Sequence, residues 1–345
     1  MTRIVLDAMG GDHAPTSEIE GALMAVRDLD VEITLVGPES RLRQELSGIT
    51  SGSERGIEVV DAPEVISMGE SVAQAVRRKR NSTLRVGMRL VREGYADGFV
   101  SAGNTGAIMA TAKMVLRTLG KIDRPALAAV LPTVARKPAV LIDVGANAEC
   151  KPFHLLQFAM MGDVYARAIL GVGKPVVGLV SIGEEQLKGN ELTREAHKLL
   201  EQSGLHFVGN IEGQAIYAGK VDVIVCDGFT GNVILKVSEG TSEMLFEVIK
   251  QELLKSIQTR KRAVLLPPAF EDLKQRFGYE EFGGAPLLGV KDVCVICHGR
   301  STGRAIRNAI KVAAELCQKR VPERIETEMA KLGSEWGVSH QGANA

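Results

Sequence analysis

The sequence predicts an α/β protein with three layers, in which helices cover both faces of a mostly parallel sheet. Short apolar runs recur along the chain, and most lack the alternating polar residues of a half-exposed strand. Segments with helical spacing separate these runs, and this alternation is typical of parallel sheets. The predicted strands are residues 3–6, 32–36, 57–60, 98–101, 126–132, 139–144, 176–182, 221–226 and 293–297.

The first predicted helix covers residues 17–29, with the sequence SEIEGALMAVRDL. Ile19, Leu23 and Val26 lie on one face at helical spacing, which is the pattern of a helix that packs against a sheet. Ser17 and Glu20 have the spacing of a capping box. We therefore expect Ser17 to cap the start of this helix.

Residues 238–278 interrupt the alternation of strands and helices, and their spacing predicts a helical hairpin with a Pro-Pro turn. We expect this hairpin to be inserted in a single catalytic region, residues 1–332, followed by a frayed polar tail, residues 333–345. Its tip is basic and apolar, and could be a solvated loop above a core helix pair. Alternatively, an apolar helix face makes a dimer contact and the tip touches an anionic membrane surface. The tip residues are Arg260, Lys261, Arg262, Val264, Leu265 and Leu266.

The composition limits the possible classes of protein. The chain has 345 residues, of which 45 % are hydrophobic, so a folded globule is expected. Its 42 basic residues balance 42 acidic residues, which argues against a nucleic-acid-binding protein. Five cysteines in a chain of this length do not suggest a disulfide framework. With neither a signal peptide nor a long apolar run, we expect a cytoplasmic protein.

Two short motifs have competing interpretations. CVICH, residues 294–298, matches the pattern of covalent haem attachment. However, it lies in an apolar strand that places Cys294 and Cys297 on opposite faces, so we expect two core side chains. RRKR, residues 77–80, follows a helical segment. It is either a solvated helix end or a docking site for an acidic partner or phosphate.

The loops that follow the predicted strands are rich in Gly, Asn, Asp, Ser and Thr. In doubly wound sheets, ligands bind beyond the carboxyl ends of the strands. We therefore expect several of these loops to line one cleft, although each loop alone is an ordinary turn or helix cap. The candidate binding residues are Asp7, Gly10, Gly11, Asp12, His13, Ser101, Gly103, Asn104, Thr105, Gly106, Asn147, Asp227 and Thr230.

These loops suit a phosphate group or a developing oxyanion, because their backbone N–H groups can surround an anion. They have neither the Lys of a GxxxxGK[ST] loop nor a GxGxxG fingerprint. Asp7, Asp12 and His13 could hold a cation, but no HExxH or zinc-type CxxC pair supports a metal site. We expect no metal and no cofactor.

Eight motifs occur in this order along the chain: DAMGGDHAP, SAGNTGA, RPALAAVLPT, IDVGAN, HLLQFA, GEEQLKGNE, CDGFTGN and YEEFGGAPLLGV. Together they resemble the bacterial phosphate acyltransferases of the PlsX family. The resemblance covers residues 3 to 325, although the segment SVAQAVRRKR lacks a Pro that is often found near Ser71 or Val72.

The resemblance implies an enzyme that transfers a long acyl chain from acyl carrier protein to inorganic phosphate, for phospholipid synthesis. It implies a fold like isocitrate and isopropylmalate dehydrogenases and a homodimer that associates peripherally with the inner face of the membrane. The acyl phosphate would pass to a membrane glycerol-3-phosphate acyltransferase. Two alternatives are a phosphotransacetylase-like enzyme that uses coenzyme A thioesters and a membrane-surface scaffold without activity.

The resemblance also points to two catalytic residues, Lys188 of the KGNE motif and Asn232 of the DGFTGN motif. Phosphate is itself the nucleophile in such a reaction, so no Ser or Cys nucleophile is needed. We expect Lys188 to offset the charge of phosphate or of the developing oxyanion, and Asn232 to donate a hydrogen bond to the carbonyl oxygen. The loop from Ser101 to Gly106 would hold phosphate.

Overall fold

The computed structural model describes residues 1–49, 56–255 and 283–336 of the chain. Strands and helices alternate through most of it, as the sequence predicts. In chain order the elements are β1 (Thr2–Asp7), α1 (Thr16–Asp28), β2 (Val31–Gly37), α2 (Glu39–Ile49), β3 (Ile57–Asp61), α3 (Val72–Arg78), α4 (Thr83–Arg92), β4 (Gly98–Ser101), α5 (Thr105–Val115), β5 (Ala126–Leu131), β6 (Ala139–Ile142), α6 (Pro152–Tyr165), a π-helical turn (Ala166–Leu170), β7 (Val177–Val180), α7 (Glu191–Glu201), β8 (Phe207–Ile211), a 3₁₀ turn (Gly213–Tyr217), β9 (Val223–Val225), α8 (Gly228–Lys255), β10 (Ala285–Leu288), β11 (Val293–Ile296), α11 (Gly303–Gln318) and α12 (Val321–Trp336).

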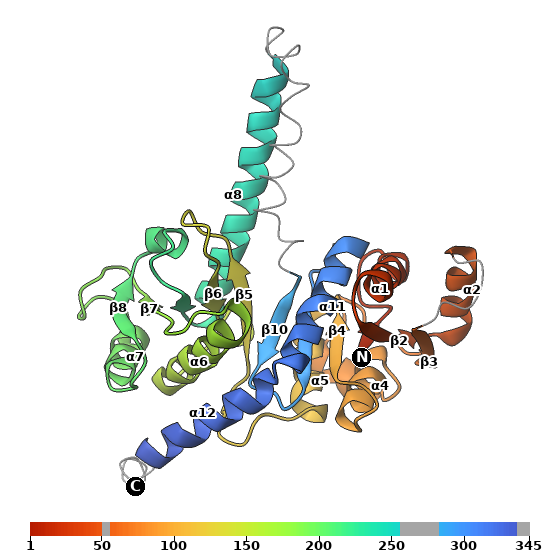
Figure 1. Cartoon of the computed structure of the whole chain (residues 1–345), viewed down its shortest axis with the longest axis horizontal. Coiled ribbons are helices and arrows are strands. Elements are labelled where there is room, and N and C mark those ends of the chain that lie inside the picture. The colour runs from red at the N-terminus through yellow and green to blue at the C-terminus, as the bar shows by residue number, and fades with distance from the viewer. Residues whose placement is uncertain (50–55, 256–282, 337–345) are drawn as a thin grey trace.

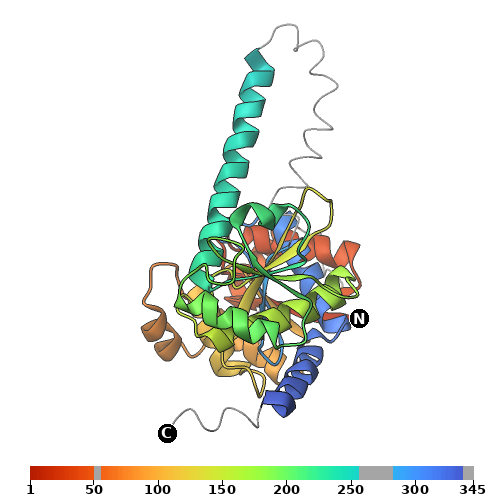
Figure 2. The ribbon, with the colours of Figure 1, turned by 90° about the vertical axis from the view of Figure 1, so that its left-hand side faces the viewer.

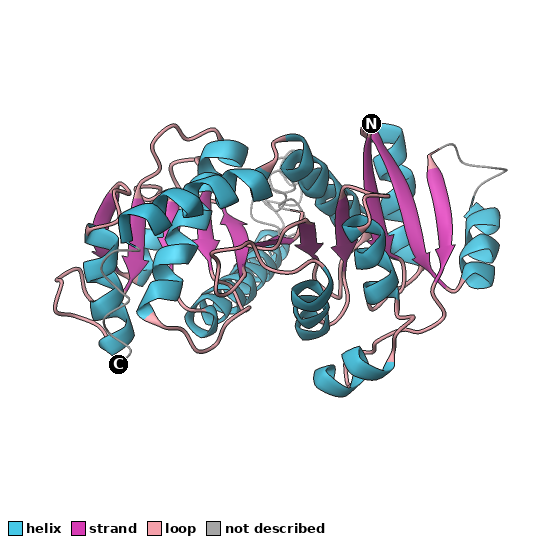
Figure 3. Ribbon diagram, turned by 90° about the horizontal axis from the view of Figure 1, so that it is seen from below, coloured by secondary structure: helices cyan, strands magenta, loops and turns pink. Residues whose placement is uncertain are grey.

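One sheet of 11 strands runs through the molecule, with helices on both faces (Figures 1 and 3). Successive strand residues enter different cores, because side chains alternate across a strand. In β1, Ile4 and Leu6 pack into one apolar cluster with α1, α6 and α11, whereas Val5 packs into a second cluster with α4 and α5. The predicted three-layer arrangement is confirmed.

The two halves of the sheet run in opposite directions. The strand order is β3-β2-β1-β4-β11-β10-β5-β6-β9-β7-β8, and pairing is parallel except at three adjacent junctions. Strands β11 and β10, β10 and β5, and β5 and β6 pair antiparallel. An odd number of reversals separates β1 and β4 from β6, β9 and β7. The carboxyl ends of β1 and β4 therefore lie at the opposite edge of the sheet from those of β6, β9 and β7, so the strand ends that carry the polar loops are not all equivalent.

The described elements differ from the predicted ones in several places. Strands β8 and β10 are additional to the nine predicted strands. Helix α1 begins at Thr16 after Pro15, with no side-chain cap, so the capping box at Ser17 is wrong. Helix α12 continues to Trp336, beyond the predicted start of the tail at 333, and residues 337–345 lie outside the described part.

Helix α8 projects from the body of the molecule (Figures 1 and 2). It has 28 residues and begins at Gly228, ten residues before the predicted start of the hairpin at 238. Several of its apolar side chains are exposed, among them Val237, Met244 and Val248. The predicted tip, residues 260–262 and 264–266, lies outside the described residues.

The two cysteines of the CVICH motif lie in the apolar core. Cys294 packs into one apolar cluster and Cys297 into the other, so their predicted placement on opposite faces is confirmed. All five cysteines are free thiols. Across residues 1–49, 56–255 and 283–336, no helix is long and apolar enough to cross a bilayer.

Candidate functional site

The first group of polar loops follows β1, β4 and β11. At the end of β1, the buried Asp7 accepts a hydrogen bond from the Ser101 hydroxyl at the end of β4, with 2.7 Å between the oxygens. The same hydroxyl accepts from the Gly103 N–H at 3.0 Å. A Cβ atom at Gly10 would lie 2.6 Å from the Gly103 nitrogen, so only glycine fits there. These contacts join two predicted binding loops into one unit.

Glu18 is a buried residue in this group that the sequence analysis did not select. Its side chain is 1 % exposed, and its Oε1 atom accepts a hydrogen bond from the Gly11 N–H at 3.0 Å. Its Oε2 atom is buried and has no hydrogen-bond partner within the described structure. Burial, with a smaller contribution from the nearby Asp7 carboxylate, raises the pKa of Glu18 to about 7. Glu18 thus holds the loop that contains Asp12 and His13, both of which are exposed.

Asn104 caps the start of α5. Its Oδ1 atom accepts a hydrogen bond from the Ala107 N–H at 3.0 Å, and its side-chain nitrogen donates to the Met68 carbonyl at 3.1 Å. The N–H groups of Thr105 and Gly106 have no acceptor in the described part of the chain. Such groups at a helix N-terminus can bind an anion. The loop is therefore open to a ligand at its backbone, while the Asn104 side chain is engaged within the protein.

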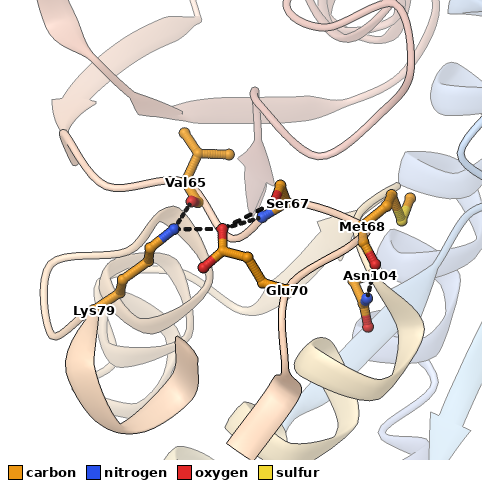
Figure 4. Close-up of polar contacts among 6 residues, drawn as sticks. All are labelled: Val65, Ser67, Met68, Glu70, Lys79 and Asn104. Atoms are coloured by element: carbon orange, nitrogen blue, oxygen red, sulfur yellow. Dashed lines mark hydrogen bonds and ion pairs between the residues drawn. The ribbon is translucent and has the colours of Figure 1, made fainter. Parts of the chain in front are cut away.

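A short network holds the Met68 segment in place (Figure 4). The Lys79 amine lies 2.6 Å from both the Glu70 carboxylate and the Val65 carbonyl. Glu70 also accepts hydrogen bonds from the N–H and hydroxyl of Ser67. The Lys79 amine is the first cause of the lowered pKa of Glu70, about 2. Through this network, Lys79 supports the carbonyl that holds Asn104.

The second group of polar loops follows β6, β7 and β9. Asp143, fully buried at the end of β6, accepts hydrogen bonds from the N–H groups of Leu127, Ala146 and Asn147. Burial raises the pKa of this carboxyl, and these donors oppose the rise. The side-chain nitrogen of Asn147 donates to Asp143 and to the Pro125 carbonyl. Both of its hydrogens are thereby engaged, so the amide nitrogen of Asn147 shapes the loop and has none left for a ligand.

The first turn of α8 packs on this loop. Asp227 caps the helix by accepting hydrogen bonds from the N–H and hydroxyl of Thr230, at 2.9 and 2.7 Å. Asn232 is exposed, and its Oδ1 atom lies 3.6 Å from the position that a Cβ of Gly145 would occupy. The structure therefore places Asn232 beside the Asp143 loop, with its side chain facing solvent.

Lys188 is exposed on the loop that follows β7. Its backbone N–H donates to the Glu185 carbonyl at 2.9 Å, and its side chain passes over Gly183. Asn190, two residues later, caps α7 through the Thr193 N–H. No carboxylate of the described residues pairs with the Lys188 amine, which leaves this cation available to a ligand at the start of a capped helix.

Helix α8 connects the two groups of loops. Its first turn contacts the Asp143 loop, and Glu243 lies 3.6 Å from Arg300 in the loop after β11. Between them, the Lys236 ammonium contributes to the lowered pKa of His298, which burial lowers first. A Cβ at Gly299 would lie 3.1 Å from the Asp12 carboxylate. The loops do not share one sheet edge, but α8 packs on the second group at its start and reaches Arg300 of the first group at Glu243.

The residues present favour anion binding over thiol or metal chemistry. Burial raises the pKa of Cys150 to about 11 and raises the pKa of Cys226 well above its ordinary value, so neither thiol is ionised at neutral pH. Among the described residues, no group of three His, Cys, Asp or Glu side chains is arranged to hold a metal ion. Among the described residues, the groups open to an anion include the N–H groups of Thr105 and Gly106, the Lys188 amine and the exposed Asn232 amide.

Comparison with known proteins identifies the family. The model of a family described as fatty acid synthesis protein matches residues 2–324. A phosphate acyltransferase of Koribacter versatilis is 54 % identical, over 99 % of this chain and 96 % of the relative. One from Acidobacterium capsulatum is 51 % identical, over 96 % of this chain and 98 % of the relative. The chain belongs to this phosphate acyltransferase family. The resemblance to PlsX is confirmed, and the protein is an acyltransferase.

Solved structures confirm the fold. The EutD phosphotransacetylase of Staphylococcus aureus aligns with a TM-score of 0.62, covering 92 % of this chain and 94 % of that one at 16 % identity. A 4-hydroxythreonine-4-phosphate dehydrogenase of Klebsiella pneumoniae aligns with a TM-score of 0.54 at 15 % identity, covering 92 % of this chain and 99 % of that one. The predicted dehydrogenase-like fold is correct, and at these identities the likeness concerns the fold alone.

Proposed function

We propose that this acyltransferase moves a long-chain fatty acyl group from acyl carrier protein to inorganic phosphate, and that the acyl phosphate serves phospholipid synthesis. The observation that carries the proposal is that the chain presents two sites for an anion, an open helix N-terminus at Thr105 and Gly106 in the first group of loops and, in the second group, a cation, Lys188, that no carboxylate of the described residues neutralises. Membership of the phosphate acyltransferase family supports it. The acyl carrier protein as donor follows from the resemblance of the sequence motifs.

In the proposed reaction, a phosphate oxygen attacks the thioester carbonyl carbon and forms the new C–O bond. The carbonyl oxygen becomes an oxyanion, which then collapses as the C–S bond breaks. The thiolate leaves and takes up a proton, giving acyl phosphate and the free thiol. Lys188 offsets the charge of phosphate or of the oxyanion, and Asn232 donates a hydrogen bond to that oxygen. Holding the two reactants together supplies a further part of the rate.

In this scheme, phosphate binds at the first group of loops. The N–H groups of Thr105 and Gly106 bind the anion, and the Asp7–Ser101 pair keeps the loop in shape. Gly10 and Gly11 allow the backbone to approach closely. In the second group of loops, the hydrogen bond from the Thr230 N–H to Asp227 fixes the start of α8, which carries Asn232.

We also propose that the protein is a homodimer that contacts the inner face of the cell membrane from the cytoplasm. The exposed apolar side chains of α8 support a contact along that helix, since a row of such side chains is stabilised by burial. The basic and apolar tip, residues 260–266, would touch anionic lipid. The product would pass there to a membrane glycerol-3-phosphate acyltransferase.

The test is release of free thiol from palmitoyl-acyl carrier protein, measured with and without phosphate. The expected result is phosphate-dependent release, together with an acyl phosphate that hydroxylamine traps. A parallel reaction contains palmitoyl-coenzyme A. Thiol release from palmitoyl-coenzyme A alone would favour the phosphotransacetylase-like alternative. If neither thioester releases its thiol, the remaining alternative is a membrane-surface scaffold without activity.

A further inference from the structure

One segment of this neutral chain has a marked excess of positive charge. Residues 71–117 contain nine lysines and arginines but two aspartates and glutamates, whereas the whole chain has 42 of each sign. The segment forms α3, α4 and α5, which pack on one another on the same side of the sheet. Such an excess on neighbouring helices produces a local positive potential that attracts acidic partners.

The structure divides the RRKR motif at the end of α3 into two parts. Lys79 turns inward and is engaged by Glu70 and the Val65 carbonyl, as Figure 4 shows. Arg77, Arg78 and Arg80 are exposed. Their guanidinium groups have no hydrogen-bond or ion-pair partner among the residues that the structure describes. Three such arginines are more than the helix end needs, because a helix dipole is complemented by charge in the last turn alone.

Helix α3 packs directly on the proposed phosphate loop. The Val72 side chain lies 3.3 Å from the position that a Cβ of Gly106 would occupy, in the first turn of α5. The Lys79–Glu70 network joins the other end of α3 to Met68, whose carbonyl holds Asn104. A partner bound to the arginines would therefore lie close to the loop that binds phosphate.

The chemistry of this surface favours a protein over a membrane. Val76 and Ala75 are buried, and the outer face of α3 presents Ala73 and Gln74 beside the arginines. Membrane contact by a short helix requires inserted apolar side chains as well as charge, and α3 exposes no large one. Arginine binds carboxylates with paired hydrogen bonds, which suits the side chains of an acidic protein.

We propose that Arg77, Arg78 and Arg80 form the docking surface for the acidic protein that carries the acyl donor. This inference rests on the proposed function, in which the donor is acyl carrier protein. Docking at these arginines brings the thioester close to the phosphate loop. The contacts of Lys79 with Glu70 and the Val65 carbonyl hold α3 in a fixed position relative to that loop.

The test compares two triple variants with the same change in net charge. Arg77→Glu/Arg78→Glu/Arg80→Glu reverses the proposed surface. Lys137→Glu/Lys174→Glu/Lys220→Glu reverses three exposed lysines of the other half of the chain. For the arginine variant we expect KM for palmitoyl-acyl carrier protein to rise by about tenfold or more, as reversal of charges at an interface slows association. We expect kcat and KM for phosphate to change less than about twofold. The lysine variant should match the unmodified protein.

A direct titration with holo-acyl carrier protein separates this inference from the proposed function. If the unmodified protein binds and turns over the carrier thioester but the arginine variant does so equally well, the docking surface is wrong and the reaction stands. If the unmodified protein releases no thiol and binds no carrier protein, both fail. If the arginine variant loses binding to vesicles of anionic phospholipid with unchanged kinetics, the surface meets a membrane instead.

Discussion

Gly231, in the first turn of α8, lies so close to Asp143 that a Cβ atom at position 231 would overlap the Asp143 carbonyl oxygen. The next residue along the helix is Asn232. The helix start and the buried Asp143 loop are thus one packed unit, and the position of Asn232 depends on the absence of a side chain at 231.

Gly231→Ala should push the first turn of α8 away from this loop and displace Asn232. We expect kcat/KM to fall by about 100-fold or more, because small misplacements of reacting groups have effects of this size. Gly240→Ala in the same helix is the matched control, since no atom lies within 4 Å of a Cβ at that position. It should retain activity and gain up to about 1 kcal/mol of stability. Equal behaviour of the two variants would contradict the packing argument.

Lys188→Ala and Asn232→Ala should each lower kcat by about 100- to 1,000-fold, the usual effect of removing one group that stabilises an oxyanion. Both side chains are exposed, so melting temperatures should stay close to that of the unmodified protein. Thiol release from palmitoyl-acyl carrier protein and thermal unfolding measure the two quantities. Lys174→Ala, also an exposed lysine, is the control. Near-normal turnover of either site variant would remove that residue from the scheme.

Glu18 should make the protein less stable as pH rises. Its pKa is about 7 in the folded protein, above the ordinary value of 4.5 that it takes in the unfolded chain, so the folded protein holds the proton more tightly. Between these values the unfolded chain binds fewer protons, and the free energy of unfolding falls with increasing pH, by roughly 3 kcal/mol from this residue. Glu18→Gln keeps an acceptor for the Gly11 N–H and removes the titration.

Urea unfolding at pH 5 and pH 8 measures the effect, with Glu20→Gln on the exposed face of α1 as control. The difference in unfolding free energy between the two pH values should shrink in Glu18→Gln and persist in Glu20→Gln. If both variants keep the pH dependence of the unmodified protein, Glu18 is ionised in the folded state at neutral pH.

Lys79→Met should weaken phosphate binding although the Lys79 amine is engaged by Glu70 and the Val65 carbonyl and contacts no ligand itself in the scheme. Without its amine, Glu70 and the Val65 carbonyl lose a shared donor, and the Met68 carbonyl holds Asn104 less firmly. KM for phosphate should rise severalfold while kcat changes little. The swap Lys79→Glu/Glu70→Lys should restore part of the loss. Lys113→Met, at an exposed position of α5, should have no effect on KM for phosphate.

The strands were predictable where both faces are buried. The run Val223–Val225 is fully buried and was found in the sequence. Strand β8 was missed because Val208 is half exposed and Asn210 interrupts the apolar pattern at the edge of the sheet. Pro286 hid β10. Apolar runs indicate burial but carry no direction, so the reversal between β11 and β6 could not be predicted.

The sequence was enough to predict which loops form the candidate site, but not what each of their side chains does there. The same residue types form helix caps and anion sites, and Asn104 and Asp227 prove to be caps. Glu18 was missed, although it shares the buried face of α1 with Ala22 and Ala25 at helical spacing. A charged residue on an apolar helix face is the signal that would have found it.

Because α8 contacts loops of both groups, a contact along the outer part of the helix that shifted its start would be coupled to binding at these loops. If such a contact changes the affinity for phosphate by some factor, phosphate must change the strength of that contact by the same factor. A protein that meets its surroundings through α8 would then sense its own substrate, and the concentration of phosphate would help to set where the protein resides.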